Sequence, residues 1–415
     1  MQKLFEQALN IQEPWYVKSI DFDCSKKCLD IISLDFRKGT RFEYTSEDGE
    51  LLSGAVHDTK EKTWRHLNFF EHECYLKARV PSIRKKDNKV EIIKTPWEGK
   101  MQGFTLLFEA LILQLCTGMP VLTASQIVTV SDDKIWLMLR RYVDEAIEHM
   151  DLEQLQILGL DETSQKKNHN YITLFVDLVK RKIVPITEGK SNETVVDFVD
   201  FLKNHNGDPD KITAVSSAMS PAFIKGITEN LPNAEITFDK FHILKIIHEA
   251  VDKVRREEAK SHEELKGNRY LFLKNNCTLT KRQRDKLKEL KISTVNLKSI
   301  RALHIRENFQ EIYNSYSIED FEIKLKKWYF WATHSKLKPI MDATKTIKKH
   351  WDGVLRWWSS KINNGILEGL NSVIQAAKSK ARGYKIAVNF KTIAFLLAGD
   401  IDLTIVNPLY ANLRK

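Results

Sequence analysis

Two acidic residues of the sequence, Asp161 and Glu368, have neighbours that suit metal-dependent chemistry. Asp161 ends the apolar part of LGLDETS, and an open α/β sheet presents residues at such strand ends to its ligand. Glu368 lies in NNGILEGLNSVIQ between Gly365 and Gly369, which permit close backbone approach. Paired carboxylates can hold two divalent ions about 3.5–4 Å apart and cleave a phosphodiester. Each acid alone is more often a turn or surface residue, so the prediction depends on the elements that position them.

The segment from residue 155 to 250 predicts the order strand, strand, strand, helix, strand, helix, strand. Strands are expected in QILGLDETS, NYITLFVDLV, KIVPITEG, ITAVSSA and AEITFD, which are short and rich in β-branched and aromatic residues. Helices are expected in SNETVVDFVDFLKNH, with Ser191 as N-cap, and in PAFIKGITENL from Pro221. Hairpin-linked strands followed by right-handed crossovers predict an α/β fold with a mixed five-stranded sheet, the order of a ribonuclease-H-like core.

A long helical region follows, from residue 240 to 350, dense in Lys, Arg and aromatic residues. A connection inside a compact α/β unit takes about 4–6 residues, so this region predicts an inserted helical domain. The expected boundaries are 151–245 for the first part of the core, 246–350 for the insertion and 351–415 for the second part, which carries Glu368.

The first 100 residues predict a small β-rich module. Residues 15–80 alternate apolar and polar side chains, as half-buried strands do. The module ends in a basic stretch that includes Arg84, Lys85 and Lys86. Contact with DNA phosphates is one interpretation of this stretch, and an ordinary solvated face is the other.

Residues 101–150 predict three helices with short turns, in FTLLFEALILQLC, LTASQIV and VSDDKIWLMLRRYVDEAI, the last capped by Ser131 or Asp132. This arrangement indicates a helix-turn-helix, with a simple three-helix connector as the alternative. Lys134, Arg140 and Arg141 lie on the last helix, where a DNA-reading helix needs basic residues.

The composition favours a polyanionic partner. The 415 residues carry a net charge of +10, which is typical of proteins that bind nucleic acid. An apolar share of 42% excludes disorder as the main state. The five cysteines are too few and too scattered for a disulfide framework. No apolar run approaches the ~20 residues of a membrane span, so we expect a cytoplasmic protein with no membrane partner.

Segments in all of these regions resemble the ISL-three family of bacterial insertion-sequence transposases, over about residues 10–410. They include WRHLNFFEHECYLKARVP, GFTLLFEAL, LGLDETS, HNYITLFVDL, MSPAFIKGI, LPNAEITFDKFHI, KKWYFWATHSKLKPI, HWDG and NNGILEGLNSVIQAAKSKARGY. The resemblance implies a DDE transposase with a zinc-ribbon-like module, a helix-turn-helix and a ribonuclease-H-like core with a helical insertion. It also implies binding to double-stranded DNA at the terminal inverted repeats, Mg²⁺-dependent cleavage and strand transfer at a two-metal site, and a homodimer on DNA.

Carried over residue by residue, the resemblance makes Asp161 and Glu368 the first Asp and the Glu of the catalytic set, and metal ligands. The second Asp of the family stands directly before MSPAFIKG, where this sequence has Ala218. A methyl group cannot ligate Mg²⁺, so we expect a catalytically inactive variant.

Ala218 admits more than one interpretation. A deliberate Asp-to-Ala change that traps a DNA complex is the first, and a natural, decayed or domesticated copy that acts as a DNA-binding regulator is the alternative. A ribonuclease-H-like nuclease without strand transfer is a further one.

Zinc is the other departure from the family. The resemblance would place cysteine pairs around residues 44–47 and 85–89, but neither stretch contains Cys. A tetrahedral zinc site needs four N or S ligands. The remaining candidates are Cys24, Cys28, Cys74, His57, His66 and His72. Bound zinc is therefore not expected, and the module should fold by hydrophobic packing.

Several accessory residues follow from the same pattern. Asp239 and His242, three residues apart in FDKFH, either reach the scissile phosphate or a DNA base, or form a helix cap with a hydrogen-bonded His. Lys378 and Arg382 follow Glu368 on or just beyond its helix, where they could hold DNA phosphates. The tryptophans of the later helices either stack on flipped bases or pack the insertion; they are Trp328, Trp331, Trp351, Trp357 and Trp358.

Overall fold

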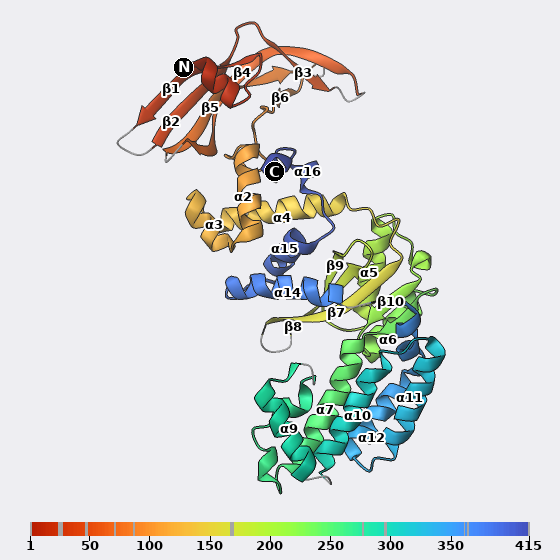
Figure 1. Cartoon of the computed structure of the whole chain (residues 1–415). Helices are drawn as coiled ribbons and strands as arrows, with labels where there is room; N and C mark the ends of the chain where they lie inside the picture. The colour runs from red at the N-terminus through yellow and green to blue at the C-terminus, as the bar shows by residue number, and fades with distance from the viewer. Residues whose placement is uncertain are drawn as a thin grey trace. The chain divides into compact units, whose positions relative to one another are not determined.

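The computed structural model describes residues 2–23, 28–45, 49–69, 72–85, 88–166, 170–275, 278–293, 297–360, 362 and 365–413, with its elements labelled in Figure 1. The chain divides into two compact units. Unit 1 comprises Met1–Met150, Ala376–Leu397 and Ile401–Lys415, and unit 2 comprises Asp151–Gln375 and Ala398–Asp400. None of the helices in the described ranges combines the length and apolar character that crossing a bilayer requires.

Unit 1 begins with a β-rich module, as the alternation in residues 15–80 predicted. Its described residues form a six-stranded sheet in the order β1-β2-β5-β4-β3, with β6 paired to β5; β2 and β5 are parallel, and the other pairs are antiparallel. The elements are α1 (Gln2–Ala8), β1 (Trp15–Asp23), β2 (Cys28–Phe36), β3 (Arg41–Thr45), β4 (Leu51–Phe69), β5 (His72–Arg84) and β6 (Val90–Ile92).

Aromatic side chains fill the interior of this module. The ring of Trp97 lies edge-on to Trp15 at 5.0 Å and to Trp64 at 5.8 Å, and Phe36 lies edge-on to Phe42 at 5.3 Å. All five side chains are buried, and edge-to-face pairs at these spacings stabilise beyond their area of burial. Hydrophobic packing therefore forms the core of the module.

The second part of unit 1 is helical. Thr105 caps α2 (Leu106–Gly118) by accepting from the Phe108 amide, and Ser131 is the N-cap of α4 (Asp132–Glu148), as predicted. A short α3 (Val121–Val128) lies between them, so the three expected helices are confirmed. The C-terminal segments of the chain pack on the same helices, α16 (Leu403–Val406) on α4 and α17 (Tyr410–Leu413) on α2. The remaining helix is α15 (Ala387–Ala398).

Unit 2 contains the predicted mixed sheet. Its described residues give five strands in the order β11-β10-β7-β8-β9, antiparallel among β7, β8 and β9 and parallel from β7 through β10 to β11. The strands are β7 (Ile157–Lys166), β8 (Asn170–Asp177), β9 (Lys182–Glu188), β10 (Ala214–Ser217) and β11 (Glu235–Phe238). All five expected strands are confirmed.

The crossover helices lie where the sequence predicted them. Pro221 is the first residue of α6 (Pro221–Asn230), but the N-cap of α5 (Glu193–Asn204) is Asn192. The expectation of Ser191 as N-cap is wrong by one residue: the Ser191 hydroxyl donates to the Glu193 carboxylate at 3.0 Å. A 3-10 helix, η1 (Pro209–Lys211), precedes β10.

A helical bundle separates β11 from the last helix of unit 2, as the length of the basic region predicted. Its core is continuous, and Trp328 is buried there, with its Nε1 donating to the Ile305 carbonyl at 2.9 Å. Trp357 and Trp358 pack against the same core, whereas Trp331 is 42% exposed. The helices are α7 (Lys240–Glu258), η2 (Glu263–Leu265), α8 (Arg269–Leu273), α9 (Lys281–Ser293), α10 (Lys298–Ile312), α11 (Ile318–Thr333), α12 (Lys338–Lys349), α13 (Trp351–Ser360) and α14 (Gly365–Lys380).

Candidate active site

Asp161, Ala218 and Asp239 lie one or two residues beyond the last parallel pairs of the unit 2 sheet, which are Ser216 with Gly159 and Ser217 with Phe238. The parallel register places Ala214 of β10 opposite Ile157 of β7 and Glu235 of β11. Four residues further along each chain segment, the same register gives Ala218 between Asp161 and Asp239. Parallel strands bring their carboxyl ends to the same edge, so this row is where the sheet presents side chains to a ligand.

Asp161 is held by a chain of hydrogen bonds that begins on α14. Asn371 Nδ2 donates to Asp161 Oδ2 at 3.2 Å, Thr163 Oγ1 donates to Asn371 Oδ1 at 2.9 Å, and Gln375 Nε2 donates to Thr163 Oγ1 at 2.7 Å. Burial raises the pKa of the Asp161 carboxyl above its usual value, while His242 and the Asn371 bond act to lower it. The carboxylate is therefore fixed in orientation but costly to ionise.

Asp239 directly follows β11 and caps α7. Its carboxylate accepts from the Phe241 amide at 3.1 Å and from His242 Nδ1 at 3.0 Å. The Asp239 side chain is 7% exposed and that of His242 is 27% exposed. The hydrogen bond from His242 to Asp239 raises the pKa of the imidazole, and the charge of Asp161 adds to the effect. The structure therefore contains the helix cap with a hydrogen-bonded His that was one of the two interpretations of this pair.

Ala218 is the first residue after β10 and is half-buried. Its neighbour Ser217 is fully buried and points to the other face of the sheet, because successive residues of a strand alternate between the two faces. Position 218, and not 217, therefore faces the edge that carries Asp161.

Glu368 lies in the first turn of α14 and is exposed. The helix packs on β7 through Leu367, since a Cβ added to Gly159 would lie 2.8 Å from Leu367 Cδ1. Glu368 precedes Asn371 by three residues, which puts both on neighbouring turns of one side of the helix. The same helix that fixes Asp161 thus carries the predicted third acid.

The side chains present at this edge do not form a complete metal site. In the described ranges, no group of three Asp, Glu, His or Cys side chains could hold a metal ion. Mg²⁺ requires oxygen ligands in near-octahedral geometry, and the methyl group of Ala218 supplies none. The residues therefore do not fit a two-metal centre as they stand.

Comparison with known families decides the class of the protein. A family model described as transposase, of the ISL3 type, matches residues 158–394, more than half of the chain, and the helix-turn-helix domain of transposase family ISL3 matches residues 93–143. The chain belongs to the ISL3 transposase family. The ISL-three resemblance found in the sequence is thereby confirmed.

Two individual relatives are also transposases. The chain is 25% identical over 341 residues to the transposase for insertion sequence element IS1001 of Bordetella parapertussis, which covers 80% of this chain and 82% of the relative. It is 23% identical over 368 residues to the transposase for IS1557 of Mycobacterium tuberculosis, covering 81% and 82%. The match extends well beyond any one domain of this transposase.

The three predicted DNA contacts on α4 differ in solvent exposure and in the groups they contact. Lys134 is exposed, with its ammonium 5.9 Å from the centroid of the Phe104 ring. Arg140 is half-buried. Arg141 is exposed, and its Nη1 donates to the Lys100 carbonyl at 2.6 Å. All three stay predicted contacts of the helix-turn-helix.

The other predicted DNA contacts lie at the ends of elements. Arg84 ends β5 and is exposed, with Nη2 3.3 Å from His57 Nε2, and Lys85 is ion-paired with Glu91. Lys86 lies outside the described residues. Lys378 is in the last turn of α14, where burial lowers its pKa. Arg382 follows that helix and adopts a positive φ of 57°.

Two of the candidate zinc ligands, His66 and Cys74, are cross-strand partners on β4 and β5. Cys74 is buried in the β-module, and His66 Nδ1 lies 2.9 Å from Thr105 Oγ1, where burial, helped by Arg65, lowers the pKa of His66 to about 4. His72 packs beside the Phe22 ring at 4.5 Å. Cys24 and the side chain of Cys28 lie outside the described residues.

The sequence did not predict a role for two residues at the edge of the sheet. Thr163 and Gln375 complete the hydrogen-bond chain to Asp161. Their spacing held a signal: Thr163 shares the strand face of Asp161 at i+2, and Gln375 shares the helix face of Asn371 at i+4. Nothing in the local pattern, however, shows that these two faces meet.

Proposed function

We propose that this chain is a DDE transposase of an insertion sequence that binds terminal inverted repeats, and that Ala218 makes it catalytically inactive. The observation that supports the proposal is the parallel register of β10 on β7, which, continued by two residues, would bring Ala218 next to Asp161. The active form would cleave DNA and transfer strands with Mg²⁺, held by Asp161, by Glu368 and by an acid at position 218. Such metal ions activate the attacking oxygen and stabilise the leaving oxygen.

The fold supports this proposal. We infer a ribonuclease-H-like core from the strand order of unit 2, in which three antiparallel strands lead into two parallel ones. The proposed domains are 1–100 for the β-rich module, 101–150 for the helix-turn-helix, 151–245 for the first part of the core and 246–350 for the insertion. From the sequence, all of 351–415 was expected in the second part of the core, but Ala376–Leu397 and Ile401–Lys415 group with unit 1.

The chain's own residues have proposed roles in this reaction. Asn371 orients the Asp161 carboxylate, and His242, held by Asp239, is an accessory donor that could contact the scissile phosphate. Lys378 and Arg382 would contact phosphates near the acids. Two ends of an element must be held together, so we propose a homodimer on double-stranded DNA.

Ala218 also favours a second candidate function, a transposase-derived regulator that binds DNA without cutting it. Both functions predict binding to terminal repeats, because the helix-turn-helix lies in unit 1 and position 218 in unit 2. They differ only in what happens when the acid is supplied.

The test is Ala218→Asp, assayed for cleavage and joining of a labelled terminal-repeat duplex with Mg²⁺. A metal ligand contributes several kcal/mol to the transition state, so cleavage should rise by about a thousandfold or more. Continued inactivity with intact binding would support the regulator, and cleavage without joined product would support a nuclease.

Two controls sharpen this test. Ala218→Asn has the shape of the acid without its charge and should stay far less active. Asp161→Asn or Glu368→Gln added to the Ala218→Asp protein should abolish activity while end binding survives. Activity that persisted without Glu368 would move the third acid to another residue. Ser217→Asp is a poorer control, because Ser217 is fully buried and a buried charge would destabilise the fold.

A further inference from the structure

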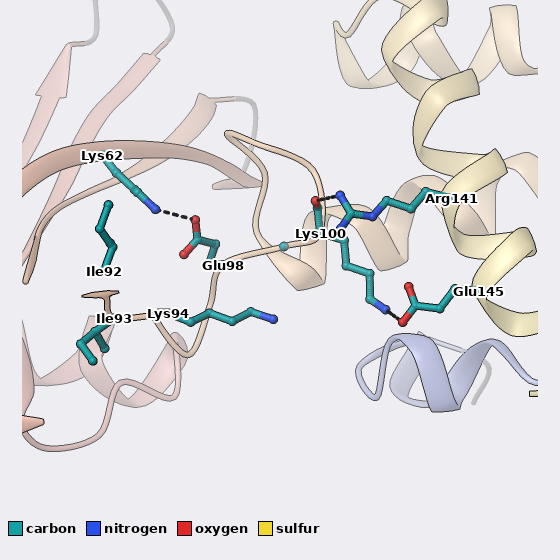
Figure 2. Close-up of a pocket in the computed structure, with 9 residues that line it drawn as sticks. Lys62, Ile92, Ile93, Lys94, Glu98, Lys100, Arg141 and Glu145 are labelled. Carbon is teal, nitrogen blue, oxygen red and sulfur yellow. Dashed lines mark hydrogen bonds and ion pairs between the residues drawn. The ribbon is translucent and has the colours of Figure 1, made fainter. Parts of the chain in front are cut away.

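Unit 1 contains a basic pocket whose lining includes one predicted DNA contact, Arg141, together with charged residues for which the sequence predicted no role (Figure 2). It has a volume of about 460 Å³ and lies among β4, the segment that follows β6, and α4. Its charged lining consists of Lys62, Lys94, Glu98, Lys100, Arg141 and Glu145.

Ion pairing among the lining side chains leaves two of the four cations without a carboxylate partner in the lining. Lys62 Nζ lies 3.0 Å from Glu98 Oε1, and Lys100 is ion-paired with Glu145, so each carboxylate already has a lysine. Arg141 donates to the backbone carbonyl of Lys100, and among the lining side chains it has no carboxylate of its own, although its charge acts to lower the pKa of the buried Glu109. Lys94 is exposed and, in the part of the chain that the structure describes, has no ion-pair partner. The pocket therefore has a net charge of about +2.

The backbone at Lys100, which forms one wall of the pocket, is fixed by hydrogen bonds to a buried carboxylate. Glu109 of α2 is fully buried, and its carboxylate accepts from the amides of Lys100 at 2.9 Å and Met101 at 2.6 Å and from the Tyr142 hydroxyl at 2.5 Å. A Cβ on Gly99 would lie 2.6 Å from this carboxylate, so a larger residue there would force the Glu109 carboxylate to move. Such support fixes the position of the surrounding cations before any ligand arrives.

We propose that this pocket binds a backbone phosphate of double-stranded DNA through Lys94 and Arg141. The inference rests on the proposed DNA-binding function and deepens it. Phosphate oxygens are the ligands that unpaired Lys and Arg side chains prefer on DNA, and such contacts position a protein without reading sequence. Arg141 lies seven residues after Lys134 on α4, two turns or about 10 Å along the same helix face. The pocket would thus anchor the DNA backbone beside the helix expected to enter the major groove.

The experiment measures binding of the full chain to a terminal-repeat duplex and to a random duplex over a range of salt concentrations. Each phosphate contact adds close to one unit to the slope of log K against log salt. Lys94→Ala should lower the slope by about 1 and weaken binding to both duplexes by the same factor, so the preference for the repeat is unchanged. Glu98→Gln should increase the slope, because it releases Lys62 from its ion pair.

Matched variants separate the possible outcomes. Lys3→Ala removes an exposed lysine of α1 and should leave slope and affinity unchanged, whereas Lys94→Arg should keep the wild-type slope. If Lys94→Ala behaves like Lys3→Ala while the wild type prefers the repeat, the pocket proposal is wrong and the proposed function stands. If Lys94→Ala instead changes the preference for the repeat, Lys94 reads a base and the phosphate assignment fails. A wild type that binds both duplexes equally would contradict the proposed function itself.

Discussion

Asp161 combines two opposed requirements at the scale of a single residue. Its position beside Ala218 suits a metal ligand, which must be ionised, yet its burial favours the neutral acid. The hydrogen bond from Asn371 and the charge of His242 reduce this penalty without removing it. Ionisation of this buried carboxyl therefore costs stability, as expected if Asp161 has the proposed functional role.

The first prediction follows from the raised pKa of Asp161. An unfolded Asp titrates near 3.9, so the folded protein binds this proton more tightly, and ionisation above the folded pKa costs stability. Asp161→Asn removes that cost and still accepts from Asn371. The variant should melt at a higher temperature than the wild type at about pH 7.5, and the difference should shrink as the pH falls through the folded pKa towards 3.9.

Thermal melts of both proteins across this pH range are the measurement. The exposed neighbour Glu162 provides the control, since Glu162→Gln should not change the melting temperature at neutral pH. An Asp161→Asn protein that melted at a lower temperature than the wild type at neutral pH would show that the ionised carboxylate stabilises the fold, against this account.

At the scale of elements, the β-module shows how a core can form from aromatic side chains. The rings of Trp15, Trp64 and Trp97 meet edge to face. Of the candidate zinc ligands, Cys74 is buried, and its cross-strand partner His66 is half-buried and hydrogen-bonded to Thr105. Strand pairing and ring packing together account for the fold of the module.

The second prediction concerns zinc in this module. Purified protein should contain well under one zinc per chain, and a chelator should leave the melting temperature unchanged, because a structural zinc would be coupled to folding. Trp97→Ala, by contrast, should lower the free energy of unfolding by about 3–5 kcal/mol, as for other buried aromatic residues. A stoichiometric zinc that persists through dialysis would refute the prediction.

Elements with strong periodicity could be predicted, and the contacts between them could not. The alternation of LGLDETS and the spacing of VSDDKIWLMLRRYVDEAI gave β7 and α4 because each pattern is local. Glu109 interrupts an apolar helix, yet it is fully buried and accepts three hydrogen bonds. Its partners lie on segments before and after it in the chain, and no local pattern records them.

At the scale of the whole molecule, the C-terminal segment returns to the helix-turn-helix. Asn407 is fully buried, and its Nδ2 lies 2.9 Å from the Leu106 carbonyl, 301 residues away, and 3.2 Å from the Tyr142 hydroxyl. The sequence predicted residues 351–415 only as the second part of the core. The composition could not predict that the C-terminal segment packs on these helices, because the packing involves single hydrogen bonds between residues far apart in the sequence.

The third prediction tests this return. Asn407→Ala leaves a buried carbonyl without its donor and should lower the free energy of unfolding by about 1–3 kcal/mol. It should also weaken specific binding to the terminal repeat, since Leu106 and Tyr142 belong to the helix-turn-helix. Urea unfolding and DNA titration measure the two effects. Asn412→Ala, at an exposed position of α17, is the control, and equal behaviour of the two variants would refute the role of Asn407.

The hydrogen bond between Asn371 and Asp161 spans 210 residues, and this separation is also an interval of time during synthesis. Ribosomes add roughly 5–20 residues per second, so about 10–40 s pass between the two residues leaving the peptidyl-transferase centre. During that interval the strand edge exists without the helix that orients its carboxylate and carries Glu368. Asn407, which is bonded to Leu106 and Tyr142, is made later still. In a nascent chain, neither the helix-turn-helix nor this strand edge therefore has all of its contacts until nearly the whole chain has been made.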